Sequence, residues 1–127
     1  MPKILILDDT PASREALARA LRQEGYETEC AHNGVEGLVR LKAKTPDLVL
    51  LDQMMPEVDG LTFLSGIRRF PKWKKLPVIM FTGLNNKANY AQAQSLGVRD
   101  YLVKADFTLP ELLDRIRKAL QPIPAQG

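Results

Sequence analysis

Runs of apolar residues along the chain predict five β-strands. Three of the runs are nearly continuous and cover residues 3–7, 47–51 and 76–81. Continuous hydrophobicity, rather than alternation, indicates strands that are buried on both faces, as in a parallel sheet covered by helices. Residues 26–31 alternate between apolar and polar positions and predict an edge strand, and residues 99–103 predict the last strand.

Capping residues and helical spacing predict five helices that follow the strands. Pro11 favours a helix start because its missing N–H would have no partner in the first turn, with Thr10 at the N-cap and Gly25 as the stop. The other expected helix starts are Asn33 with Glu36, Asp59 with Gly60, Asn86, and Thr108 with Glu111. Strands that alternate with helices predict an α/β domain with a parallel sheet and helices on both faces.

The length of 127 residues suits one domain. We expect residues 1–121 to form that domain and residues 122–127 to be a short C-terminal tail. No output domain follows the last expected helix, so the chain is either a single-domain protein or the tail begins a linker of a longer one. A single cysteine, Cys30, permits no intrachain disulfide. With no signal peptide and no apolar run of spanning length, we expect a cytoplasmic protein without membrane contact.

Five basic residues lie within eight positions that contain no acid, although the net charge is only +3. They are Arg68, Arg69, Lys72, Lys74 and Lys75. Nucleic-acid modules usually carry a far larger excess of positive charge, so we expect a solvated loop and no direct nucleic-acid binding. Trp73 lies inside this segment; we expect it to cover the lower edge of the sheet, and a partner contact is the alternative.

Polar side chains stand at the expected ends of four strands. Asp8 and Asp9 follow the first strand, Asp52 the third, Thr82 the fourth and Lys104 the fifth. Because ligands of parallel sheets sit beyond the carboxyl ends of the strands, we expect these groups to converge there. Three crowded carboxylates repel one another unless a cation neutralises them. Oxygen ligands with room for water favour Mg²⁺ over Ca²⁺.

A carboxylate beside Mg²⁺ can attack phosphorus and form an acyl phosphate. The metal and Lys104 would neutralise charge on the transferring oxygens, and the Thr82 hydroxyl would donate to one of them. Each residue alone has an ordinary interpretation, such as a turn residue, a helix cap or a surface lysine. The set at one sheet edge favours phosphoryl transfer.

Four segments together carry a resemblance to a known family. They are Asp8-Asp9, the stretch from Asp52 to Gly60, Thr82-Gly83, and the stretch from Tyr101 to Lys104. With these residues the chain resembles the receiver domains of bacterial response regulators, from its first strand to its last helix. The resemblance implies a flavodoxin-like five-stranded parallel sheet in the order 2-1-3-4-5.

The resemblance also implies a phosphorylation-dependent signalling switch. Asp52 would accept a phosphoryl group from a histidine kinase or a phosphotransfer protein. Asp9 and the backbone carbonyl of Met54 would bind Mg²⁺ directly together with Asp52, and Asp8 would act through water. Such a receiver catalyses only its own phosphorylation and dephosphorylation, so we do not expect an enzyme in the usual sense.

For the switch itself, the resemblance implies that Thr82 and Tyr101 form the moving pair and that Lys104 contacts the phosphate. The surface of the fourth helix, fifth strand and fifth helix would then bind a downstream protein. Receivers usually have proline after the lysine, whereas Ala105 stands here and the following loop is one residue longer. We therefore expect a trans Lys104–Ala105 bond, because a cis bond to alanine costs roughly 3–4 kcal/mol, and a lysine that still reaches the carboxylates.

Two other functions are open to the same residues. A haloacid-dehalogenase-type phosphatase needs a second aspartate two positions after the nucleophile, where Met54 stands, and no P-loop for nucleotide hydrolysis is present. A degenerate receiver that only binds partners would have lost acidic residues, and all three are retained.

Overall fold

The structure, a computed structural model, describes residues 1–121 and consists of strands and helices that alternate along the chain. The strands are β1 (Lys3–Leu7), β2 (Glu27–Ala31), β3 (Leu48–Leu51), β4 (Val78–Thr82) and β5 (Asp100–Val103). The α-helices are α1 (Pro11–Gln23), α2 (Gly34–Ala43), α3 (Gly60–Ile67), α4 (Lys87–Ser95) and α5 (Leu109–Ala119). Two short 3₁₀ helices, η1 (Pro71–Trp73) and η2 (Lys104–Asp106), lie in the connections after α3 and β5.

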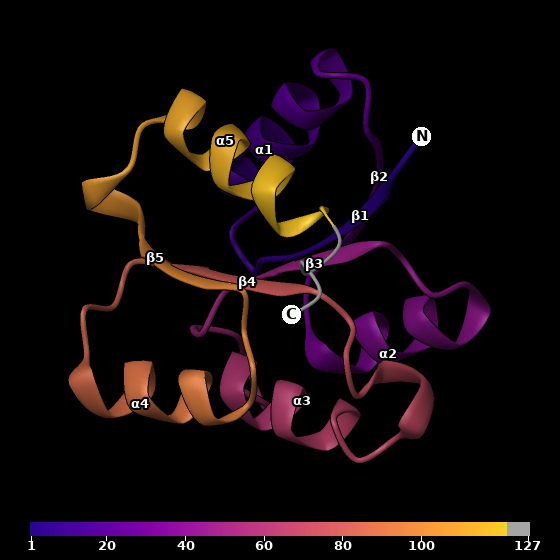
Figure 1. Cartoon of the computed structure of the whole chain (residues 1–127), viewed down its shortest axis with the longest axis vertical. Helices are drawn as coiled ribbons and strands as arrows, with labels where there is room; N and C mark the ends of the chain where they lie inside the picture. Colours follow the sequence, from indigo (N-terminus) through magenta and orange to yellow (C-terminus); the bar gives the residue numbers. More distant parts are fainter. Residues whose placement is uncertain (122–127) are drawn as a thin grey trace, which may run out of the picture.

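All strand pairs are parallel, and the sheet order is β2-β1-β3-β4-β5, as expected. Helices α1 and α5 cover one face of the sheet, and α2, α3 and α4 cover the other (Figure 1). Strand β2 lies at an edge of the sheet, which confirms the prediction made from its alternating apolar and polar residues. Strand β4 begins at Val78 rather than at residue 76, because Pro77 has no N–H to donate to a ladder. Within residues 1–121, no helix combines the length and apolarity needed to cross a bilayer.

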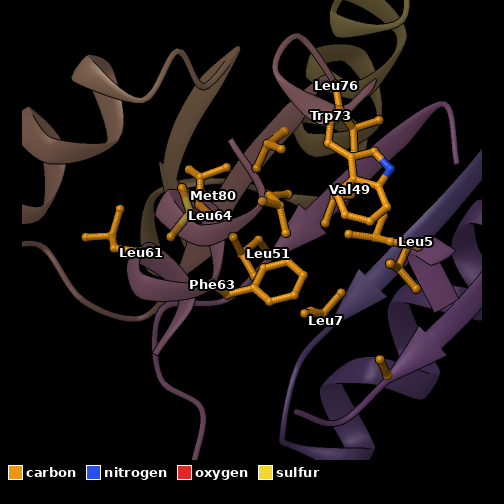
Figure 2. Packing of buried hydrophobic residues seen from close by; sticks show 14 of the residues in the cluster. Leu5, Leu7, Val49, Leu51, Leu61, Phe63, Leu64, Trp73, Leu76 and Met80 are labelled. Carbon is orange, nitrogen blue, oxygen red and sulfur yellow. The ribbon is translucent and has the colours of Figure 1, made fainter. Parts of the chain in front are cut away.

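The sheet divides the apolar interior into two clusters. Alternate residues of β1 point to opposite faces, so Ile4 and Ile6 pack under α1 and α5 while Leu5 and Leu7 pack on the other side. Figure 2 shows Leu5 and Leu7 in the cluster on this second side of the sheet, together with side chains of β3 and α3 and the indole of Trp73. Burial on both faces explains the continuous apolar runs of β1, β3 and β4.

The basic segment after α3 is more ordered than a solvated loop. Trp73 is fully buried, and its indole Nε1 donates to Thr45 Oγ1 at 3.1 Å, so the alternative of an exposed partner contact is wrong. The guanidinium of Arg68 donates to the carbonyl oxygens of Leu96 at 2.9 Å and Leu76 at 2.7 Å. The expectation of a solvated loop is therefore wrong for Arg68. The other four cations of the segment are exposed, as expected.

The predicted helix caps are present with one exception. Thr108 and Glu111 form a complete capping box, and the Asn33 side chain accepts from the backbone N–H of Glu36. Thr10 occupies the N-cap position of α1, but its side chain makes no capping hydrogen bond. The helix is instead tied to the sheet edge through Asp8.

Candidate functional site

Three carboxylates meet at the carboxyl edge of the sheet, as the sequence predicts. Asp8 and Asp9 follow β1 and Asp52 follows β3, and each offers an oxygen within 4.8 Å of the others. Asp8 is 2% and Asp52 6% exposed, whereas Asp9 faces solvent. This arrangement could hold a cation with all-oxygen ligands, and its exposed member leaves a path for an ion and a phosphoryl donor to enter.

Asp8 is fixed by residues in and just before α1 and by Lys104 of η2. Its Oδ1 accepts from the backbone N–H of Thr10 at 2.9 Å, and its Oδ2 accepts from Ser13 Oγ at 2.7 Å and Lys104 Nζ at 3.1 Å. Arg14 donates to the Asp8 carbonyl oxygen at 2.7 Å. These contacts hold the buried carboxylate in one orientation, with its charge partly balanced.

Asp52 has weaker support than Asp8. Lys104 Nζ lies 3.4 Å from Oδ2, and the backbone N–H of Met54 donates to Oδ1 at 3.3 Å. Burial raises the pKa of Asp52 above its ordinary value; the Lys104 ammonium and the Met54 N–H oppose that rise, and the charge of Asp8 adds to it. A cation in the cluster would favour the charged form of Asp52, which is the form that can attack phosphorus.

Lys104 reaches this cluster as predicted. It leaves β5 through η2, and the Lys104–Ala105 bond is trans, since no peptide bond within residues 1–121 is cis. Besides its contacts to Asp8 and Asp52, its ammonium donates to Ser13 Oγ at 3.2 Å and lies 5.7 Å from the centre of the Phe81 ring. The 3₁₀ turn η2, which contains Ala105, therefore redirects the chain after β5.

Thr82 and Tyr101 contact the same loop residue. Thr82, at the end of β4, is fully buried, and its Oγ1 accepts from the backbone N–H of Leu84 at 3.3 Å. The half-buried Tyr101 donates its hydroxyl to the Leu84 carbonyl oxygen at 3.2 Å, and its ring packs edge-on against Tyr90 of α4. A displacement of the Thr82 hydroxyl would thus change the hydrogen bonding of Leu84, to which the Tyr101 hydroxyl is also bonded.

Met54 lies beside the carboxylates, at the rim of a hollow of about 350 Å³. Asp9, Gln53 and Asp59 line the same hollow. The side chain of Met54 is exposed and carries a thioether rather than an oxygen, so only its backbone carbonyl can contribute to a metal site of oxygen ligands. The loop continues through Glu57, whose φ of 70° is in the left-handed region.

The sequence interpretation missed three residues that shape the site. Ser13 and Arg14 hold Asp8, and they could have been found because they occupy the first turn of the helix that starts just after it. Gln53 is buried, and its Oε1 accepts from the backbone N–H of Leu61 at 2.8 Å. That bond joins α3 to the residue after Asp52, and no motif spacing indicates it.

Comparisons with known proteins agree with this geometry. The family model of the response regulator receiver domain matches residues 4–117. A regulator from Synechocystis sp., described as the DNA-binding dual master transcriptional regulator RpaA, is 37% identical over 95% of this chain and 50% of its own length. The phosphate regulon transcriptional regulatory protein PhoB of Rhizobium meliloti is 34% identical over 95% of this chain and 53% of its own. The chain thus spans about half the length of these curated relatives.

Solved structures show the same fold. A putative response regulator from Chloroflexus aurantiacus matches with a TM-score of 0.86 and 33% identity, covering 94% of this chain and 97% of that one. The Vibrio cholerae chemotaxis protein CheY4 matches with a TM-score of 0.87 and 28% identity, covering 94% and 98%. Fold and site together define a phosphorylation-dependent signalling switch. The chain belongs to the response regulator receiver domain family.

Proposed function

We propose that Asp52 is the residue that accepts the phosphoryl group. The observation that carries the proposal is the placement of Asp52 beside Asp8, Asp9 and the Lys104 ammonium. An Asp52 carboxylate oxygen attacks phosphorus of a phosphohistidine in a kinase or phosphotransfer protein. The bond from phosphorus to the imidazole nitrogen breaks, the electron pair stays on that nitrogen, and an aspartyl phosphate forms.

Mg²⁺ is the proposed cofactor, and it would neutralise charge on the transferring oxygens. Asp9, Asp52 and the backbone carbonyl of Met54 would bind it directly, and Asp8 would act through water. The donor set fits, because it is made of oxygens and lies beside an open hollow. We expect Asp9→Ala to weaken Mg²⁺ binding more than Asp8→Ala. Equal Mg²⁺ affinities of the two variants by calorimetry would contradict this ranking.

Lys104 and Thr82 would stabilise the phosphoryl group once it is attached. Lys104 already lies within 3.4 Å of Asp52 and needs only a small side-chain movement to reach a phosphoryl oxygen. The Thr82 hydroxyl would donate to a second oxygen, which takes it away from the Leu84 N–H that it now accepts from. In these roles Lys104 and Thr82 bind the phosphoryl oxygens, and neither acts as a general base for hydrolysis of the aspartyl phosphate.

The signal would leave the site through Leu84. When Thr82 turns toward the phosphate, Leu84 loses one hydrogen bond, and the Tyr101 hydroxyl that binds the Leu84 carbonyl is released to move inward. That would reshape the surface of α4, β5 and α5, where we place the downstream protein partner. Thr82→Ala should accept phosphate normally but couple it poorly to partner binding. A variant that responds as strongly as the wild type would refute the route.

The remaining assignments follow from this function. Residues 1–121 would form the whole switch, located in the cytoplasm, which catalyses only its own phosphorylation and dephosphorylation. DNA binding is named for the relative from Synechocystis sp., which is about twice as long, and we do not propose it for residues 1–121. The expected tail at residues 122–127 lies outside the described residues.

The test is incubation with acetyl phosphate, a small phosphoryl donor, followed by intact-protein mass spectrometry. We expect one phosphoryl group per chain when Mg²⁺ is present and none when EDTA removes it. Asp52→Asn should prevent labelling, while Glu57→Gln, a change at an exposed acid of the same loop that does not line the hollow, should leave it intact. Labelling of the Asp52→Asn protein at the wild-type rate would contradict the assignment.

A further inference from the structure

An apolar groove runs between α2 and α3, on the side of the molecule away from β5 and α5. It has a volume of about 260 Å³, and its walls include Val35 and Leu38 of α2 and Gly66 of α3. Phe70, just after α3, lines the end of the groove at the C-terminus of α3, which is called its lower end below. Val35 is 63% and Phe70 49% exposed, although both are large apolar side chains. The groove lies outside the site described above, and the proposed function leaves it without a role.

Glycine keeps this groove open. A Cβ built on Gly66 would have no neighbour within 4 Å, so a side chain there would project into free space rather than into the core. The wall from Thr62 to Ile67 corresponds to roughly two turns of helix, or about 10 Å. A ligand of that length with apolar groups along one side would bury them in the groove.

The lower end of the groove is strongly basic. Exposed cations stand near the C-terminal ends of α2 and α3, and none of them forms an ion pair within residues 1–121. They are Lys42, Lys44, Arg69, Lys72, Lys74 and Lys75. The contact between Trp73 and Thr45 holds this loop against the end of α2, so both groups of cations belong to one surface.

We propose that the α2–α3 groove docks an amphipathic helix of another protein, with acidic residues at the end that meets the basic rim. The apolar floor would take side chains spaced at i, i+3 or i+4, and i+7 along that helix. These lysines and Arg69, which form no ion pair within residues 1–121, would attract acidic side chains and fix the direction in which the helix lies. This surface is separate from the α4, β5 and α5 surface proposed for the phosphorylation-dependent partner.

The apolar floor is what favours a helix over a nucleic acid. A phosphate backbone would gain from the cations but would leave Val35, Leu38 and Phe70 facing its charges. A bilayer meets a broad apolar surface, whereas here the apolar side chains line a narrow hollow between two helices. A second copy of the chain would bring its own basic rim, so it serves as a competing outcome in the test.

The probe is a designed, fluorescently labelled helical peptide with leucines at i, i+4 and i+7 and glutamates in its first turn. Its binding to the unphosphorylated full chain is followed by fluorescence anisotropy, and the contact is located by amide NMR shifts of Gly34 and Gly66. We expect a peptide with lysines in place of the glutamates to bind about tenfold more weakly. The measurement needs neither Mg²⁺ nor phosphate, so it succeeds or fails independently of the proposed function.

Two pairs of variants test the groove itself. Gly66→Trp should fill it and weaken peptide binding about tenfold or more, while Gly66→Ala should bind within about twofold of the wild type. Val35→Glu should weaken binding by a similar factor. Val39→Glu is the matched control on the same helix, because Val39 is 59% exposed but does not line the groove. Cooperative thermal unfolding of each variant, followed by circular dichroism, shows that the variants fold.

Several outcomes would overturn the proposal. They are no saturable binding of the acidic peptide, equal binding by Gly66→Trp and Gly66→Ala, and amide shifts that map away from the groove. A labelled DNA duplex would assign the surface to nucleic acid instead if it bound the wild type more tightly than the peptide does and bound Gly66→Trp more weakly. Dimerisation in analytical ultracentrifugation that Gly66→Trp abolishes would assign it to a second copy.

Discussion

Replacing Gly60 by alanine should destabilise the protein far more than a single methyl group normally does. A Cβ at Gly60 would lie 2.3 Å from the Asp52 carbonyl oxygen and 3.0 Å from the Gln53 Cα. Both neighbours are backbone atoms and cannot turn aside as a flexible side chain can. The Gly60 N–H donates to the Gln53 carbonyl oxygen at 3.0 Å, so moving α3 away would break the contact that holds it against the end of β3.

The magnitude follows from the size of the overlap. Relieving it requires a shift of about 1 Å, since carbon and oxygen prefer separations near 3.5 Å. Overpacking in a core costs about 1–3 kcal/mol, and a backbone neighbour places Gly60→Ala at or above the upper end, about 3 kcal/mol. That is a large share of the roughly 5–15 kcal/mol that stabilises a small domain. Because the overlap is with Asp52 itself, any surviving fold should also phosphorylate more slowly.

Gly66 of the same helix provides the control. It is exposed and has open space around its Cβ position, so Gly66→Ala should stabilise the helix by about 0.5–1 kcal/mol. The assay is urea unfolding, followed by circular dichroism and by fluorescence of the single, buried Trp73. A loss below about 1 kcal/mol in Gly60→Ala with an unchanged urea dependence would refute the reasoning from backbone contact.

Three further predictions concern stability and can use the same urea assay. Glu57→Gly should stabilise the protein by about 0.5–1 kcal/mol. Glycine removes the cost of the left-handed backbone at φ 70°, and this gain exceeds the loss that comes from the greater conformational entropy of glycine in the unfolded chain. A loss of stability would contradict this. Arg68→Met should cost about 2–3 kcal/mol, because the carbonyl oxygens that Arg68 binds lose their donor, whereas exposed Arg69→Met should stay within about 0.5 kcal/mol. Burial raises the pKa of Asp52 above 3.8, so the native state holds that proton to higher pH than the unfolded chain, and stability should fall as pH rises through the window above 3.8. Asp52→Asn should flatten that pH dependence and raise stability at neutral pH without Mg²⁺, and an unchanged pH profile would contradict the sign.

The fold could be predicted because burial on both faces leaves a direct mark on the sequence. The runs at β1, β3 and β4 are almost continuously apolar, and each ends at a polar residue of the site. A parallel sheet then brings those residues together whatever the details of the helices. The convergence of Asp8, Asp52 and Lys104 could therefore be predicted from the positions of the strand ends alone.

Contacts that depend on how helices and loops pack could not be predicted in this way. Arg68 looked like its neighbours in a basic run, and its carbonyl partner in Leu96 lies 28 residues further along the chain. The link from Thr82 through Leu84 to Tyr101 depends on the path of the β4–α4 loop, for which the sequence carries no periodic signal. Ser13 required the rotation of α1 about its axis to be known.

The central claim is that one carboxylate, that of Asp52, becomes the aspartyl phosphate. The most direct measurement is to phosphorylate the protein with acetyl phosphate and Mg²⁺, reduce the acyl phosphate with borohydride, and sequence the peptides by tandem mass spectrometry. Reduction converts a phosphorylated aspartate to homoserine, so the modified position is recorded permanently. We predict homoserine at position 52 and at no other aspartate. Homoserine at position 8 or 9, or none at position 52 after stoichiometric labelling, would contradict the account.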